Sequence, residues 1–330
     1  MRHVTISQFG QNLGVTGNRL VVTDREGNRW ETALSRLRSI RIEKFGVSVS
    51  SNLMLQCALR GIRIFVMDWR HVAVAAMSGC NQHAVVALRK AQFECVNSEA
   101  CSVIATEFVH AKLRNQRAVL LYFNKYVSRT NLSSSQILKQ SACQIEELSK
   151  QLFDAYCKER WRERLMGIEG RAATVYWTAL SQSGLLPESF EIREGRGAKE
   201  ITNAALNYGY SILQSYVWSA LDNAGFELYE GFLHKERIGR ASLVMDFMEE
   251  YRAWVVDRNI IKLRARLSES NTLSKDLKKE ISDAIDHTFE SKLQWHGKSV
   301  KLENIIQRQA YRLSGTVIGE RTYKGFHFKW

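Results

Sequence analysis

The feature that most constrains the fold is a change of hydrophobic pattern near residue 80. Before it, short β-like apolar runs such as Val4–Ile6 and Arg19–Thr23 are separated by glycines and charged turns. From about Gln82 onward, apolar residues recur at helical spacing. A chain of 330 residues is also too long for one small core. We therefore predict an α+β protein, with a small β-rich N-terminal domain over residues 1–80 and a larger all-helical domain over residues 81–330.

The charge of the chain indicates what kind of partner it binds. The formal net charge is +13 and the pI is about 9.5, and such a balance favours a polyanionic partner. Nucleic acid fits better than a membrane surface, because the sequence has no basic amphipathic anchor and no lipidation motif.

The absence of export signals and the pattern of cysteines indicate the cellular compartment of the protein. The sequence has no signal-peptide pattern and no apolar run long enough to cross a bilayer. Its six cysteines form no Cys-x-x-Cys pair and stop halfway along the chain, so they predict free thiols rather than a zinc site or a disulfide framework. We therefore expect a cytoplasmic protein with no membrane partner.

One stretch, Phe232–Arg252, combines potential metal ligands with the start of a helix. A loop carrying His234 precedes a helix expected from about Ser242, which we predict as its N-cap. On this helix Asp246 and Glu249 are three residues apart and lie beside an apolar face. A histidine near two carboxylates suits a hard divalent cation. The alternative is an acidic solvated helix face with an unrelated loop histidine.

A second stretch, Arg164–Trp177, is predicted as a helix that places Glu169 between Gly167 and Gly170. Each interior glycine costs a helix roughly 1 kcal/mol relative to alanine. Two glycines around one carboxylate therefore indicate that something approaches this helix closely. Tight helix–helix packing is the alternative, and both interpretations can hold together.

Basic side chains gather in three places that are candidates for phosphate contacts. These are a helix over Phe108–Leu121, a loop over Gly184–Lys199 whose glycines let backbone amides approach an anion, and the residues after His234. The candidates are Lys112, Arg114, Arg117, Arg193, Arg196, Lys199, Lys235, Arg237 and Arg240. The alternatives are a solvated helix face, an ordinary surface loop and, after His234, pairing with Asp246 and Glu249.

A polar stripe accompanies these charged groups. Asn203, Asn207, Tyr210 and Gln214 recur at helical spacing on an otherwise apolar helix. Polar groups are costly to bury unless they find partners. We therefore expect this stripe either to support the metal site or to line a DNA channel.

Four motifs carry a family resemblance: Gly167–Gly170, Asn203–Tyr210, Gly231–His234 and Ser242–Arg252. In this order and spacing the chain resembles the CRISPR-associated spacer integrases, the metal-dependent nuclease subunits of CRISPR adaptation. The likeness covers nearly the whole chain. It includes a tail at Tyr323–Phe326 that has glycine where the family usually has proline before the phenylalanine.

The resemblance implies a specific chemistry and specific partners. Glu169, His234 and Glu249 would hold Mg²⁺ or Mn²⁺ as the catalytic set, and Asp246 would complete the site or bind a second ion. The activity would be that of a DNA endonuclease and integrase that joins the 3′-hydroxyl ends of a prespacer to a CRISPR repeat. The N-terminal domain would form a homodimer contact, and the small CRISPR adaptation subunit would be a further partner.

Two other functions fit parts of the same sequence. A casposase-like transposon integrase shares the chemistry, but casposases usually carry additional C-terminal DNA-binding modules. A non-catalytic nucleic-acid-binding protein would explain the charge and leave the acidic residues structural. Metal dependence separates them, because DNA binding by a simple binder should respond to divalent ions only through ionic strength.

Overall fold

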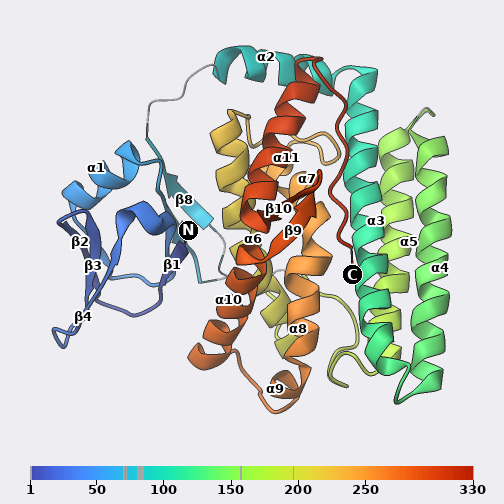
Figure 1. Cartoon of the computed structure of the whole chain (residues 1–330), viewed down its shortest axis with the longest axis horizontal. Helices are drawn as coiled ribbons and strands as arrows, with labels where there is room; N and C mark the ends of the chain where they lie inside the picture. The colour runs from blue at the N-terminus through green and yellow to red at the C-terminus, as the bar shows by residue number, and fades with distance from the viewer. Residues whose placement is uncertain are drawn as a thin grey trace. The chain divides into compact units, whose positions relative to one another are not determined.

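The computed structural model describes residues 2–69, 71, 73–79, 85–156, 158–195 and 197–329. The chain forms two compact units, Met1–His83 and Ala84–Trp330. The first is rich in strands and the second is mostly helical (Figure 1), which confirms the predicted α+β class. No described helix is long and apolar enough to cross a membrane.

The first unit contains two four-stranded sheets. One has the order β1-β5-β7-β8, in which β1, β5 and β7 are parallel and β8 is antiparallel to β7. The other has the order β4-β3-β2-β6, in which β4, β3 and β2 form an antiparallel meander. Their bounds are β1 Arg2–Ile6, β2 Asn12–Thr16, β3 Arg19–Thr23, β4 Arg29–Ala33, β5 Leu37–Ile42, β6 Ser48–Val49, β7 Arg63–Met67 and β8 Ala73–Met77.

A short helix and its cap complete the core of this unit. The 3₁₀ turn η1 (Leu34–Arg36) follows β4, and α1 (Ser51–Leu59) follows β6. The Ser50 hydroxyl accepts a hydrogen bond of 3.2 Å from the Leu53 amide and so caps α1. Leu53 itself is fully buried among the apolar side chains of the strands.

The described residues of the second unit form helices and one β-hairpin, so the expectation of an all-helical domain was incomplete. The hairpin is formed by β9 (Lys292–Trp295) and β10 (Lys298–Lys301). Its turn residues His296 and Gly297 both have positive φ, as a type I′ hairpin turn requires. The helices are α2 Val85–Val96, α3 Glu99–Val127, α4 Leu132–Ala155, α5 Trp161–Gln182, α6 Ile201–Ala224, α7 Ser242–Tyr251, the π-helical η2 Arg252–Asp257, α8 Arg258–Lys262, α9 Arg264–Ser268, α10 Lys275–Glu290 and α11 Leu302–Val317.

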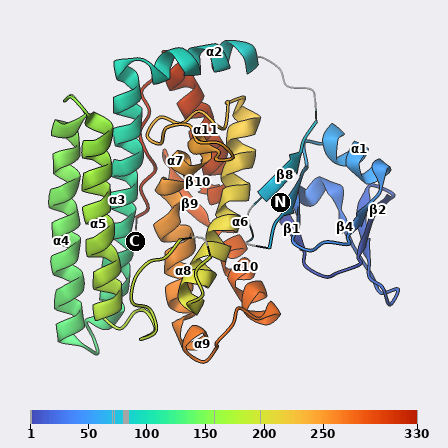
Figure 2. The same cartoon turned by 180° about the vertical axis from the view of Figure 1, so that it is seen from behind.

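Three long helices organise the helical unit. Figures 1 and 2 show α3, α4 and α5 side by side, and α3 also packs against α7. The apolar side chains of these helices belong to one continuous core. Since α3 contacts both α5 and α7, it brings side chains of three distant segments together.

The start of α7 differs from the prediction. Ala241 is the N-cap and makes no side-chain cap bond, while Ser242 is the first helical residue. The Ser242 hydroxyl instead donates a 3.1 Å hydrogen bond to the Lys235 carbonyl. The expected N-cap was therefore wrong, because this serine ties the preceding loop to the helix.

Candidate active site

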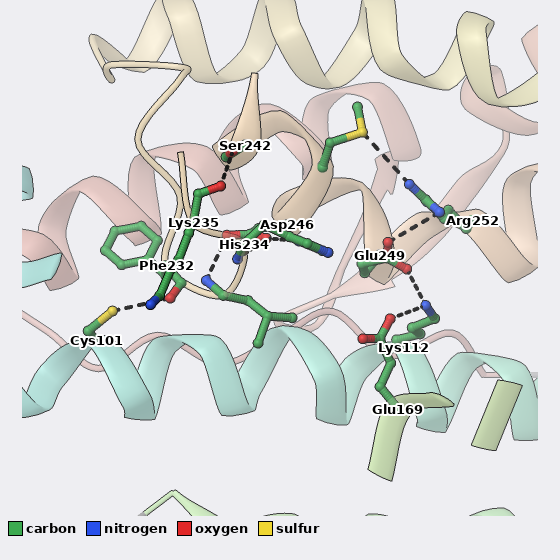
Figure 3. Close-up of polar contacts among 12 residues, drawn as sticks. Cys101, Lys112, Glu169, Phe232, His234, Lys235, Ser242, Asp246, Glu249 and Arg252 are labelled. Atoms are coloured by element: carbon green, nitrogen blue, oxygen red, sulfur yellow. Dashed lines mark hydrogen bonds and ion pairs between the residues drawn. The ribbon is translucent and has the colours of Figure 1, made fainter. Parts of the chain in front are cut away.

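One lysine joins two of the three predicted metal ligands. The Nζ of Lys112 on α3 lies 2.5 Å from Oε1 of Glu169 on α5 and 2.7 Å from Oε2 of Glu249 on α7 (Figure 3). On the other side of Glu249, Arg252 Nη1 lies 3.2 Å from Oε1. We call these four residues the lysine–carboxylate cluster. Carboxylates from two helices thus converge on one ammonium group from a third.

The third predicted ligand, His234, is held by Asp246. The Nδ1 of His234 lies 2.5 Å from Oδ1 of Asp246. The backbone amides of Leu233 and His234 also donate to Asp246, at 2.8 and 3.1 Å. Asp246 therefore fixes both the loop and the imidazole, and a proton on Nδ1 leaves Nε2 available as a ligand atom.

The burial of α7 excludes the acidic solvated face that we considered as an alternative. Asp246 is fully buried and Glu249 is 3% exposed. Ionised carboxylates are not buried without compensation. Here Glu249 is compensated by Lys112 and Arg252, and Asp246 by the amides and imidazole of its loop.

The two glycines beside Glu169 face open space. A Cβ added at Gly167 or Gly170 would meet no described atom within 4 Å. Packing between helices of the described chain therefore does not require these glycines, contrary to one of our two interpretations. Gly231 is different, because a Cβ there would come within 2.7 Å of the His234 carbonyl oxygen and 2.8 Å of Asp246 Oδ2.

The cluster keeps Glu249 and Lys112 charged. Burial acts to raise the pKa of Glu249, but the charges of Arg252 and Lys112 outweigh it and hold this pKa below the ordinary value. Burial acts to lower the pKa of Lys112, but Glu249 and Glu169 raise it above the ordinary lysine value. At neutral pH the site therefore contains an ionised Glu249 held by Lys112 and Arg252.

The cluster and its neighbour supply ligand types that suit a divalent cation. No group of three or more histidine, cysteine, aspartate or glutamate side chains in the described ranges is placed to hold one metal ion. However, Glu249 Oε2 is buried and has no hydrogen-bond partner besides its ion-pair contact with Lys112, so it retains acceptor capacity. A set of two carboxylates and one imidazole tolerates Mg²⁺ or Mn²⁺. By ligand type, Glu169, Glu249 and His234 suit such a cation, and the ammonium of Lys112 lies against the two glutamates in this structure.

A second buried network adjoins the cluster. Tyr210 and Tyr176 donate to Asp257 at 2.5 and 3.1 Å, and burial raises the pKa of Asp257 to about 6. The guanidinium of Arg252 lies over the Tyr210 ring, 5.1 Å from its centroid. The predicted polar stripe thus supports the cluster through Tyr210.

Two asparagines of the same stripe hold the loop before α6. Arg193 donates to Asn203 Oδ1 at 3.0 Å and to Asn207 Oδ1 at 2.7 Å. Asn203 donates in turn to the Ile192 carbonyl and Asn207 to the Gly195 carbonyl. The Arg193 guanidinium also lies over the Tyr210 ring, 5.3 Å from its centroid. These bonds fix the loop that we predicted to contact DNA.

Adjacent glutamates on α7 have different partners. Glu250 accepts hydrogen bonds from the Tyr323 hydroxyl and, at 2.9 Å, from the Phe326 amide, and burial raises its pKa to about 7.

In the C-terminal tail, the Gly325 amide donates to Glu107 at 3.3 Å. A proline, usual at this position in the resembled family, could not make that bond.

The predicted phosphate-binding residues fall into two groups. Arg114 and Arg117 both pair with Glu146, at 3.4 and 2.8 Å, and Lys112 and Arg193 have the internal partners given above. By contrast, the structure shows no carboxylate paired with Lys235, Arg237 or Arg240 within its described residues. Lys199 is exposed, and Arg196 lies outside the described part of the chain.

Sequence reasoning missed three members of this arrangement: Arg252, Tyr176 and Asp257. Arg252 could have been found, because it follows Glu249 by three residues on a predicted helix. Tyr176 and Asp257 are 81 residues apart and meet only through tertiary packing. Nothing in their local sequence predicts that contact.

Comparison with known proteins establishes the family. Residues 4–282 match the family described as CRISPR associated protein Cas1. A CRISPR-associated endonuclease Cas1 of Francisella tularensis subsp. novicida is 44% identical over 330 residues, covering 100% of both chains. A casposase bound to integration product has a similar fold, with a TM-score of 0.81, 21% identity and coverage of 98% of this chain and 93% of that one. A chain of a Cas6-RT-Cas1–Cas2 complex gives 0.79 at 20% identity, covering 100% of this chain and 36% of that one. The chain therefore belongs to the Cas1 family.

Proposed function

We propose that this protein is a metal-dependent DNA endonuclease and integrase that joins the 3′-hydroxyl ends of prespacer DNA to a CRISPR repeat. The observation that carries the proposal is the convergence of Glu169 and Glu249 on one cationic group, with His234 oriented by Asp246. Family membership supports it. So does the net charge of +13, which suits a DNA substrate.

Each residue of the site has a role in this chemistry. Glu169, Glu249 and Nε2 of His234 would hold Mg²⁺ or Mn²⁺, which neutralises charge on the scissile phosphate and aligns the attacking oxygen. Asp246 keeps the imidazole in the orientation and tautomer that a ligand needs. Arg252 holds Glu249 ionised and is itself placed against Tyr210.

The choice of nucleophile decides between cutting and joining. Water at the site gives nicking, whereas a bound DNA 3′-hydroxyl gives strand transfer. Binding holds that hydroxyl at a high effective molarity, so joining should exceed hydrolysis although water is abundant. The open face beside Gly167 and Gly170 leaves room for a DNA backbone to approach Glu169 closely.

The assembly is part of the proposal. The strand-rich unit over residues Met1–His83 would join two copies of the chain. A second partner would be a small adaptation subunit of the Cas2 type, because one similar solved chain is part of a complex with Cas2. Removing residues 1–83 should leave a monomeric fragment with poor integration, and light scattering that showed an unchanged oligomer would refute this assembly.

The test is a strand-transfer reaction with a labelled donor. A short duplex with free 3′-hydroxyl ends should be joined to a repeat-containing target in Mn²⁺ or Mg²⁺, and the product should appear as a longer labelled strand on a denaturing gel. EDTA, a 3′-dideoxy donor and Glu169→Gln should each abolish the product. Equal yields from hydroxyl and blocked donors would mean a nuclease without strand transfer. DNA binding with no product under any condition would favour the simple nucleic-acid-binding protein.

A further inference from the structure

The loop that follows His234 presents one apolar side chain to solvent. Ile238 is 103% exposed, and the residues from Lys235 to Gly239 are all exposed. We call residues 235–240 the basic loop, because Lys235, Arg237 and Arg240 outnumber Glu236. An aliphatic side chain with no contacts at the centre of a basic segment gains nothing from the fold of its own chain, which points to an external partner.

This loop is held in place rather than free to fold inward. The residues before its N-terminal end are fixed by Asp246, which accepts hydrogen bonds from the amides of Leu233 and His234. The Ser242 hydroxyl then holds the Lys235 carbonyl (Figure 3). The tip is closed by a 2.9 Å hydrogen bond from the Arg240 amide to the Arg237 carbonyl. Gly239 has φ of +73°, a conformation that glycine adopts without strain in such a tight turn.

The chemistry around Ile238 suits nucleic acid better than a protein surface. A stable protein interface buries about 800 Å² on each partner, far more than one side chain on a turn supplies. Proteins that deform DNA insert single apolar side chains between base pairs while nearby basic groups hold the phosphates. Arg237 and Arg240 flank Ile238, and the described residues offer neither of them a carboxylate partner.

We infer that Ile238 is a wedge that enters the target duplex at a base step beside the reacting phosphate. The basic loop would hold the phosphates on either side, and unstacking this step would bend the duplex at the position where His234, which directly precedes the loop, meets the backbone. The inference rests on the proposed function only for the identity of the reaction. Insertion itself is a binding event that requires no chemistry.

The first experiment measures insertion directly. The repeat-containing target carries 2-aminopurine at one base step at a time near the junction, and its fluorescence is read on binding in EDTA. Wild-type protein should raise the fluorescence at one step, because 2-aminopurine brightens when it is unstacked. Ile238→Ala should lose that rise and keep its affinity within about threefold, since phosphate contacts supply most of the binding. No rise at any step with wild-type protein would overturn the wedge, even if strand transfer were found.

The second experiment measures the consequence for joining. Ile238→Ala should join an intact target at least about tenfold more slowly, because the cost of unstacking is no longer offset by the inserted side chain. A target with a mismatch at that step is already unstacked, so it should restore the rate. Equal losses on both targets would place Ile238 in another role, and wild-type rates on both would exclude any role.

Two control variants exclude trivial explanations. Leu132 is a second exposed aliphatic residue of the helical unit, at 81% exposure, and Leu132→Ala should change neither fluorescence nor rate. Ile238→Leu keeps the apolar volume and should retain the fluorescence rise. An unchanged Tm for Ile238→Ala is expected from its full exposure. If Leu132→Ala behaved like Ile238→Ala, the effect would not belong to the basic loop.

Discussion

The lysine–carboxylate cluster and the basic loop both carry positive charge, but they use it differently. In the cluster, Lys112 and Arg252 lie against Glu169 and Glu249, and each charge is compensated inside the chain. In the basic loop, the structure gives the cations no carboxylate partner among its described residues. We therefore expect a positive charge in the sequence to contact DNA only where no internal carboxylate already pairs with it.

The two regions should also respond differently to mutation. Removing one member of a buried ion pair leaves an uncompensated charge in the protein, which is costly to stability. Removing an exposed cation costs almost nothing in stability, but it removes a phosphate contact and hence the release of counterions. Stability measurements should therefore report on the cluster, and the salt dependence of DNA binding should report on the basic loop.

The largest expected effect is on the stability of Glu249→Ala. This change leaves Lys112 and Arg252 with one buried carboxylate fewer, and it should lower the free energy of unfolding by about 3–5 kcal/mol. Urea denaturation measures it. The matched control is Glu146→Ala, which breaks the partly exposed pairs with Arg114 and Arg117 and should cost only about 0–1 kcal/mol. Similar losses of unfolding free energy in the two variants would mean that the buried ion pairs of the cluster stabilise the fold no more than these partly exposed pairs do.

A pH dependence of stability is expected from the buried network beside the cluster. Burial raises the pKa of Asp257 from 3.8 to about 6 in the folded protein. A raised carboxyl pKa contributes stability that is fully present below pH 3.8 and is lost as the pH rises through 6, on the order of 2–3 kcal/mol. Asp257→Asn cannot titrate, so its unfolding free energy should lack this loss. Parallel stability curves between pH 4 and 7 for the two proteins would contradict it.

Asp246→Asn should weaken metal binding. The amide cannot accept bonds from both the imidazole and two backbone amides as the carboxylate does, so His234 loses its orientation. Loss of such a supporting carboxylate lowers metal affinity by about 10–100-fold. Calorimetric titration with Mn²⁺ measures this, and Glu236→Gln in the exposed loop is the control. An unchanged affinity would remove Asp246 from the site.

The smallest expected effects concern the salt dependence of DNA binding. Replacing Lys235, Arg237 and Arg240 together with glutamine should reduce the slope of log K against log salt by about 2.7, at about 0.9 for each lost phosphate contact. Arg114→Gln with Arg117→Gln should reduce it by less than about 1, because Glu146 already neutralises these cations. Fluorescence anisotropy at several salt concentrations gives both slopes. The reverse ranking would place the DNA interface on α3.

Local sequence pattern predicted much of the fold. The α+β class followed from the change of periodicity, and the long helices were predicted because their apolar positions repeat over several turns. The strand β2 was not predicted, because Asn12–Thr16 is short and has glycine at its centre. Its place in the sheet comes from pairing with β3 and β6, which a local pattern does not encode.

Less of the candidate site than of the fold could be predicted from the sequence. The helical spacing placed Asp246 and Glu249 on one face, but it did not predict that one orients a histidine while the other meets a lysine. Lys112 was grouped with Arg114 and Arg117 as a basic surface, because the packing of α3 against α5 and α7 is absent from the local sequence. Separate roles for neighbouring residues of one helix depend on which helices pack on each side.

The most direct test of the proposed metal centre is the binding of Mn²⁺ in the absence of DNA, measured by electron paramagnetic resonance. We expect the wild-type chain to bind Mn²⁺, and Glu169→Gln, His234→Ala and Glu249→Gln each to lose at least about tenfold in affinity as one ligand is removed. Lys112→Met should bind Mn²⁺ at least as tightly as the wild type, since the ammonium occupies the same carboxylate oxygens. Equal Mn²⁺ affinity in the wild type and all three ligand variants would contradict a metal site at Glu169, His234 and Glu249.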